Sequence, residues 1–167
     1  MDERLSVIFK RRSIRAYTGD PVSEADVEAL LQAGMAAPSA SNRKPWHLVA
    51  VTDRTVLRAL ADAHPHGKML AQAGLAIAVC GDPAISDFWV QDCTAATENI
   101  LIAVATLGLG GVWLGCHGRP EREQAVRQVL GAPESIGVLS VLSIGHPAEE
   151  KEPRTQYDPA RVHRNRW

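Results

Sequence analysis

The residues best suited to chemistry begin with a basic run near the N-terminus. Three arginines and one hydroxyl lie within five residues, namely Arg11, Arg12, Ser13 and Arg15. Guanidinium groups bind phosphate through paired hydrogen bonds, and a hydroxyl adds a further donor. The same run could instead be a solvated basic surface at the end of a short helix, where cations suit the helix dipole. The residues alone leave both interpretations open.

A second segment offers uncharged polar groups. It runs from Pro38 to Trp46 as PSASNRKPW, in which two prolines bracket small hydroxylic residues and an amide. Serine and asparagine side chains can donate to and accept from the polar edge of a heterocycle, and the prolines restrict the loop. Composition alone favours an ordinary surface loop.

A third segment is rich in glycine. Residues 107–115 read LGLGGVWLG, and glycines of this kind let a backbone approach something flat and large. The segment is not a dinucleotide-binding GxGxxG, because Val112 and Trp113 stand where further glycines should be. The sequence also contains no GxxxxGK[ST] phosphate loop. A helix end followed by a tight turn accounts for Gly108 but not for all four glycines.

Other site chemistries find little support. His64 and His66 form an isolated HxH without a carboxylate or cysteine at ligand spacing, and HExxH, CxxC and GxSxG do not occur. The three cysteines are irregularly spaced, which argues against a disulfide framework and favours a reducing cytoplasm. We therefore assign no metal site.

Composition narrows the class of protein. The chain has 167 residues, of which 46% are hydrophobic and 22% charged, with a formal net charge of -1. These values predict one folded domain and exclude a disordered chain, and they provide no global field to recruit nucleic acid or an anionic membrane. Residues 93–116 are weakly charged, but Glu98, Asn99 and the glycines make them a poor membrane span. The N-terminus does not read as a signal peptide.

The elements that must position these segments follow from periodicity, caps and breakers. Helices are predicted at 2–10, from Ser23 to before Pro38, at 54–63, at 90–107 and at 120–130. Strands are predicted at 47–52, 75–80, 111–114 and 138–144. The uneven alternation, without repeats or linkers, predicts a single α+β domain over 1–167. Residues 147–167 form a charged C-terminal arm whose Tyr157, Val162 and Trp167 suggest that it packs on something.

Taken in order, these segments resemble a known family. RRSIR, then PSASNRKPW, then a long apolar helix into GLGGVWLG, and finally GHP at 145–147 are similar to the flavin-dependent nitroreductases over nearly the whole chain. The resemblance implies a mixed sheet flanked by helices and an intertwined homodimer with two FMN molecules at its interface. It also implies hydride transfer from NAD(P)H through flavin N5 to an electron-poor acceptor such as a nitroaromatic or a quinone.

The resemblance further implies which residues bind FMN. The segment matching the phosphate and ribityl site is Arg11, Arg12, Ser13 and Arg15, with Arg15 also near the pyrimidine edge. The loop matching the second chain's contribution is Pro38, Ser39, Ala40, Ser41 and Asn42. The strand beside the ring, where a backbone N–H can donate to N5, is Trp113, Leu114 and Gly115. Lys68 matches a position near N1–O2, and the late basic pair that completes the phosphate site is Lys151 and Arg154.

The chain also departs from the family's pattern. Lys44 stands where members usually carry glutamine, and the chain is short, so the substrate pocket should be open, with walls from the His64–Lys68 turn and the Phe88–Trp89 region. No side-chain acid or base is evident, so we assign no catalytic residue. Two alternatives stay open: another flavin chemistry, such as reductive dehalogenation or small-substrate oxidation, and a non-enzymatic FMN-binding protein.

Overall fold

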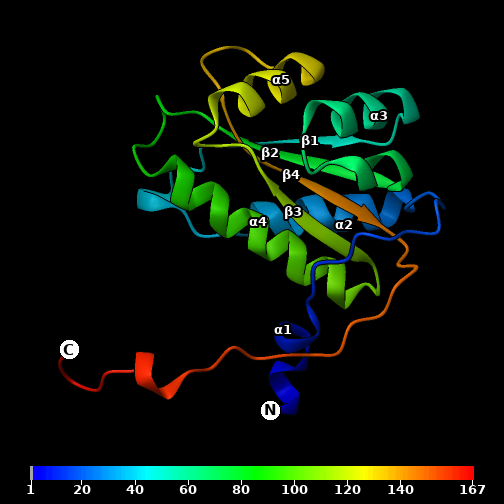
Figure 1. Ribbon diagram of the computed structural model, residues 1–167. Helices are drawn as coiled ribbons and strands as arrows, with labels where there is room; N and C mark the ends of the chain where they lie inside the picture. Colours follow the sequence, from blue (N-terminus) through cyan, green and yellow to red (C-terminus); the bar gives the residue numbers. More distant parts are fainter. Residues whose placement is uncertain (1) are drawn as a thin grey trace.

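The computed structural model describes residues 2–167 and is built around a four-stranded sheet (Figure 1). The strands are β1 (Trp46–Val51), β2 (Leu75–Gly81), β3 (Gly110–Gly115) and β4 (Gly137–Gly145). They are ordered β1-β2-β4-β3, so β1 and β3 are the edges and the two most apolar runs lie at the centre. Every residue of β2 and β4 is buried, as expected for strands covered on both faces.

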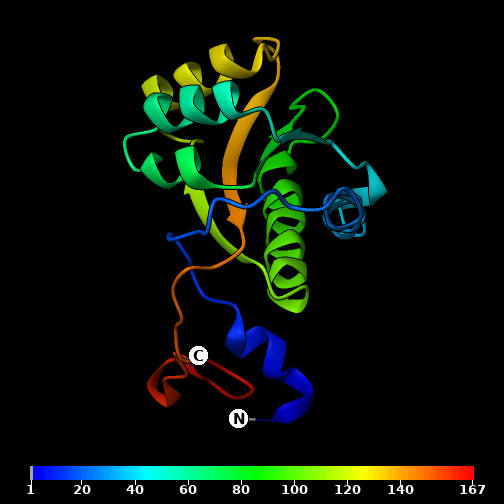
Figure 2. The same cartoon turned by 90° about the vertical axis from the view of Figure 1, so that its right-hand side faces the viewer.

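Helices cover the sheet on both faces. On one side α2 (Glu24–Met35) packs against α4 (Trp89–Thr106), and on the other α3 (Arg54–Ala63) packs against α5 (Pro120–Leu130), as Figures 1 and 2 show. Each face has its own apolar core. The shorter helices are α1 (Ser6–Lys10) and the 3-10 turns η1 (Glu3–Leu5), η2 (Ala40–Asn42), η3 (Lys68–Gln72) and η4 (Pro159–Arg161). No helix within residues 2–167 is both long and apolar enough to cross a membrane.

The predicted α+β class is confirmed, with one refinement to the sheet. All pairings between the four strands are antiparallel, although a mixed sheet was expected. Within residues 2–167, the parallel component is a single isolated bridge between Ser13 and Gly111. Periodicity indicates that a segment is a strand but not whether it pairs parallel or antiparallel with its neighbours. The sequence therefore could not predict the direction of the strands.

Two glycines make room for one large side chain. The indole of Trp89, in the first turn of α4, lies over Gly81 of β2 and Gly137 of β4. A Cβ atom built on Gly137 would lie 2.5 Å from Trp89 Cη2, and one on Gly81 would lie 2.5 Å from Trp89 Cε3. These glycines are therefore required by close packing, and neither has a positive φ.

We expect Gly137→Ala to destabilise the fold by about 1–3 kcal/mol, because the added methyl group overpacks a buried contact. Urea unfolding of the purified protein measures this change. Ser140→Ala is the matched control on the same strand, since the buried Ser140 hydroxyl has no hydrogen-bond partner among the described residues. Its removal should be neutral or stabilising. Equal free energies of unfolding for the two variants would contradict the packing argument.

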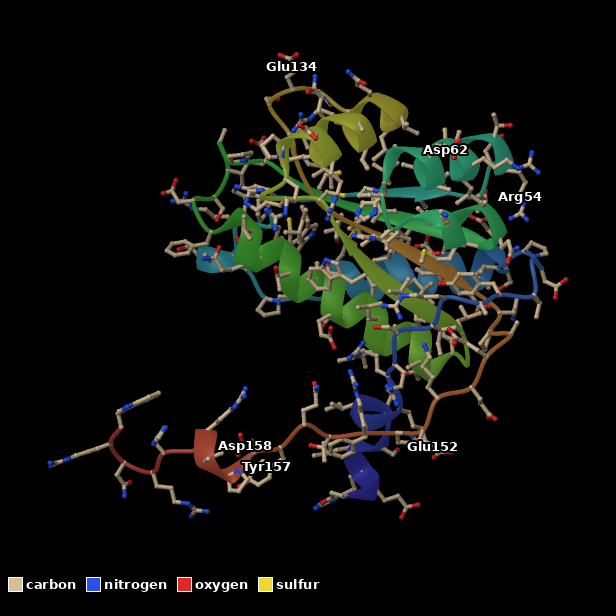
Figure 3. The ribbon with its side chains drawn as sticks, viewed as in Figure 1. Arg54, Asp62, Glu134, Glu152, Tyr157 and Asp158 are labelled. Atoms are coloured by element: carbon tan, nitrogen blue, oxygen red, sulfur yellow. The ribbon has the colours of Figure 1, made fainter. Side chains whose placement is uncertain are left out.

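The two ends of the chain project from the body together (Figures 1 and 2). The C-terminal arm passes α1, where Arg154 N donates to the Phe9 carbonyl at 3.0 Å. Figure 3 shows Glu152 at this crossing and Tyr157 farther out, away from the sheet. Tyr157 is 69% exposed and Trp167 is fully exposed. The apolar residues of the arm therefore do not pack on the body of their own chain.

Candidate cofactor site

The basic segment near the N-terminus lies along the edge strand β3. Ser13 forms a parallel bridge with Gly111, and Ile14 N donates to the Gly111 carbonyl at 3.0 Å. Tyr17 holds the segment against the sheet. Its hydroxyl is within hydrogen-bond distance of two carbonyls, that of Ile14 at 2.8 Å and that of Ser143 at 2.9 Å. Ile14 is buried while its neighbour Arg15 is exposed. Extended backbone thus directs alternate side chains into the core and out to solvent.

The C-terminal arm brings the late basic residues to the same place. Lys151 Nζ donates to the Ser13 carbonyl at 2.6 Å, and an Arg12 guanidinium nitrogen donates to the Glu152 carbonyl. Arg154 reaches this region through its backbone N–H, while its side chain is exposed. Residues about 140 positions apart in the sequence therefore form one basic cluster.

Two carboxylates that we did not predict take part in this cluster. Glu149 Oε1 accepts from Arg15 N at 2.5 Å and from Ala16 N at 3.3 Å, and Glu149 Oε2 lies 3.2 Å from Lys151 Nζ. The bond from Arg15 N and the contact with Lys151 lower the pKa of Glu149. Glu98 on α4 lies 3.3 Å from the Arg11 guanidinium. The acidic pair at 149–150, one residue after GHP, was the signal that could have pointed to Glu149.

The outer edge of β3 presents backbone groups to this cluster. The Gly111 carbonyl points away from β4, because it accepts from Ile14, and so does that of Gly115, which accepts from His64 Nε2 at 3.1 Å and Arg122 Nη1 at 2.7 Å. Both polar groups of a strand residue point the same way, so the N–H groups of Trp113 and Gly115 also face this edge. A Cβ built on Gly115 would meet Trp113 Nε1 first, at 3.8 Å. The edge thus presents backbone donors beside the basic cluster.

The other two residues singled out near this edge differ in their placement. Leu114 pairs with Val141 of β4, and its side chain is buried, so it supports the strand without facing the edge. Lys68 is exposed and begins η3, whose Met69 packs against Ile14 and Tyr17. The turn that carries Lys68 is therefore adjacent to the basic segment.

The loop from Pro38 to Asn42 lies elsewhere. Ala40 N donates at 2.8 Å to the buried carboxylate of Asp92, in the first turn of α4. The basic segment lies at the other end of that helix, because a Cβ on Gly111 would meet Val104 at 3.3 Å. Twelve residues of α-helix separate Asp92 from Val104, which corresponds to about 18 Å. Within one chain, the loop does not join the basic cluster.

The loop itself has an unusual backbone. Ser41, Asn42 and Lys44 have φ values of 50°, 56° and 51°, in the left-handed region. Ser39 Oγ stabilises this shape by accepting from Lys44 N at 3.0 Å. Ser41, Asn42 and Lys44 are exposed. The polar side chains are therefore presented to the outside by a shaped loop.

The stability of the fold should depend on the protonation of His64. The residue is only 2% exposed, and burial lowers the pKa of the imidazole below its ordinary value of 6.5. Well above pH 6.5 the ring is neutral in both the folded and the unfolded state. Below it the unfolded chain takes up the proton more readily, so the free energy of unfolding should fall as the pH drops.

Urea unfolding at pH 7.5 and 5.5 tests this expectation. His64→Gln, which does not titrate in this range, should reduce the loss of stability between the two pH values. A pH dependence that is unchanged in the variant would assign the loss to other groups.

Comparison with known proteins identifies the family of the chain. A model of the nitroreductase family matches residues 8–69 and 63–146 of the chain. A protein of Archaeoglobus fulgidus, whose name gives it provisionally as an NADH dehydrogenase/NAD(P)H nitroreductase, is 49% identical over 174 aligned positions that cover all of both chains.

Solved structures extend the similarity to the whole fold. An FMN-dependent nitroreductase from Clostridium difficile R20291 has a TM-score of 0.93 and 29% identity, over 98% of this chain and 99% of that chain. A protein from Desulfovibrio desulfuricans, provisionally a nitroreductase and solved in complex with FMN, has a TM-score of 0.85 and 27% identity, over 100% and 99% of the two chains. The present chain belongs to the nitroreductase family.

Proposed function

We propose that this protein is an FMN-dependent oxidoreductase that carries hydride from NAD(P)H to an electron-poor acceptor such as a nitroaromatic or a quinone. One observation carries the proposal: basic residues from both ends of the chain meet beside the open, donor-bearing edge of β3. A phosphate-bearing, flat cofactor requires this combination of cations and backbone donors. The FMN carried by family members has this shape and charge.

The chain's own residues would divide the work of binding. Arg11, Arg12 and Lys151 would hold the phosphate, while Arg15 and Lys68 would bring positive charge to the pyrimidine edge of the ring. The N–H groups of Trp113 and Gly115 would face the ring from β3. Bound FMN supplies hydride acceptance and donation at its N5 atom. The protein's contribution is then orientation and electrostatics, with no side-chain acid or base assigned.

We further propose that the active unit is a homodimer of single-domain chains, spanning residues 1–167, with each cofactor site shared between the two chains. The Pro38–Asn42 loop lies about 18 Å along α4 from the basic cluster, so it would serve the site of the second copy.

Three free, buried cysteines in the described residues support a cytoplasmic location.

The surface offers a place for the arm of that second copy. A groove of about 410 Å³ between α2 and α4 is lined mainly by apolar side chains, including Ala29, Ala33, Ile102 and Ala103. Helix α2 carries three carboxylates and no lysine or arginine, whereas residues 158–167 carry three arginines and one aspartate. An exposed arm with apolar side chains and positive charge therefore matches an apolar groove beside an acidic helix.

Deleting residues 156–167 should lower the thermal stability and shift the dimer toward monomer at micromolar concentration, because the arm's apolar side chains lose their partner surface. Sedimentation velocity and thermal melting measure both effects. Thr155→Ala, an exposed substitution just before the deletion, is the control. A full-length protein that sediments as a monomer with bound FMN would contradict the shared site.

A visible spectrum of the purified protein tests the cofactor directly, since bound flavin gives characteristic absorbance. NADH or NADPH consumption, with and without a nitroaromatic or a quinone, then tests the reaction. Acceptor-dependent consumption is the expected result. Flavin absorbance without acceptor-dependent consumption would instead indicate another flavin chemistry or an FMN-binding protein without this activity, and a colourless protein that takes up no FMN would contradict the proposal.

A further inference from the structure

The HxH sequence of His64 and His66 has a structural role that its spacing did not reveal. The His64 ring is buried, and its two nitrogens contact different segments. Nδ1 accepts from His66 N at 3.2 Å, which leaves the ring proton on Nε2, and Nε2 donates to the Gly115 carbonyl at 3.1 Å. The ring thus spans the distance between a turn and the end of β3.

The turn held by His64 is tight and carries Lys68. Gly67 N donates to the His64 carbonyl at 2.8 Å, and Leu70 N donates to the Gly67 carbonyl at 2.8 Å. A Cβ on Gly67 would lie 3.0 Å from both the Cβ and the carbonyl oxygen of His64, so the turn is closely packed at this position. Fixing the His64 ring therefore fixes where Lys68 starts η3.

The other end of the contact is equally constrained. The Gly115 carbonyl receives a second donor, Arg122 Nη1 of α5, at 2.7 Å. Because the carbonyl and N–H of a strand residue point to the same side, holding the carbonyl also orients the Gly115 N–H at the open edge. His64 and Arg122 together prevent the last residue of this edge strand from fraying.

We propose that His64 is a positioning residue of the cofactor site, which sets the separation between the Lys68 turn and the Gly115 end of β3. The inference rests on the proposed function, because both segments are assigned to FMN there. A ring bound at its N1–O2 edge by Lys68 and at N5 by the Gly115 N–H needs these two groups at a fixed spacing. His64 is the side chain that connects them.

Two substitutions separate the contacts of the ring. In His64→Gln the amide nitrogen lies at the ε position and can still donate to Gly115, whereas in His64→Asn the shorter amide can still accept from His66 N but does not reach Gly115. His64→Gln gives up the bond from His66 N, but Gly67 N still donates to the backbone carbonyl of residue 64 and holds the turn. We therefore expect His64→Gln to keep the FMN dissociation constant within about threefold of the wild type. Loss of one hydrogen bond in His64→Asn should weaken FMN binding about five- to tenfold and shift the visible flavin bands.

Fluorescence titration with FMN and visible difference spectra measure these effects without relying on turnover. His47→Asn is the matched control, because His47 is exposed on β1, at the opposite edge of the sheet from β3. Equal affinities and spectra for His64→Asn and the wild type would overturn the proposal, and so would equal losses in His64→Asn and His64→Gln.

If His64→Asn does not fold, a second variant still tests the proposal. Arg122→Met removes the other donor to the Gly115 carbonyl and should weaken FMN binding by a similar factor. Unchanged affinity would refute the inference that holding this carbonyl positions the Gly115 N–H. A wild-type protein that binds no FMN would contradict the proposed function itself. Binding by the wild type and by all variants alike would contradict only the role of His64.

Discussion

The double variant Arg11→Ala/Arg15→Ala is expected to purify colourless, with an affinity for FMN at least a hundredfold below that of the wild type. Each arginine is assigned a charge-assisted hydrogen bond to the cofactor, worth about 1.5–3 kcal/mol, and 1.4 kcal/mol corresponds to a factor of ten. Absorbance of the purified protein and titration with free FMN measure the loss.

The fold should survive this change. The contact between Arg11 and Glu98 is partly exposed, and such ion pairs contribute about 0–1 kcal/mol. Arg15 contacts Glu149 through its backbone N–H, which alanine retains. Arg58→Ala, which removes an exposed guanidinium from α3, is the control and should stay yellow. Stoichiometric FMN in the double variant would show that the phosphate is bound elsewhere.

The second large effect is a difference in the number of tight FMN sites between two mixed dimers. Arg15→Ala weakens the basic cluster, and Asn42→Ala removes an amide from the loop. On the proposed binding, the loss of this amide would leave a polar group of the cofactor unpaired at a cost of about 1–3 kcal/mol. If each site takes its cluster from one chain and its loop from the other, the arrangement of the two substitutions matters. Differently tagged chains, co-expressed and purified as heterodimers, give both arrangements.

The two arrangements predict different numbers of tightly bound FMN molecules per dimer. With both substitutions on one chain, each of the two sites carries one defect, so neither binds FMN tightly. With one substitution on each chain, one site carries both defects and the other is intact, so one FMN per dimer is retained. Equal retention in the two heterodimers would disprove sharing. The homodimers of each single variant, measured beside them, report the two separate losses.

Local patterns were sufficient to predict most elements. The predicted bounds of α3 and α5 agree with the structure: apolar spacing indicated α3, and a proline in the first turn indicated α5. The cap that Asp53 provides to α3 is seen only in the structure. The strand predictions deviate by one residue at their ends, where fraying and local pairing decide the boundary. The direction of the strands depends on tertiary packing and was not predictable.

The candidate site was less accessible to sequence reasoning, because its geometry rests on contacts between distant residues. Lys151 reaches Ser13 across 138 positions, and Asp92 fixes Ala40 across 52. Glu149 and His64 had no recognisable motif in these roles, since an acidic pair and an HxH occur in many surroundings. The left-handed backbone of Asn42 was also not foreseen, although asparagine tolerates it better than most residues.

The open edge of β3 also bears on how the protein behaves while it is being made. An edge strand with unpaired backbone groups is a template for pairing with strands of other chains. The segment at Ser13 covers Gly111, and His64 and Arg122 occupy the carbonyl of Gly115, but the backbone groups of Trp113 still face outward. If FMN binds along this edge as proposed, a chain that folds before it meets FMN keeps the short edge available for aggregation. Flavin supply during expression should therefore govern the yield of soluble protein as well as its colour.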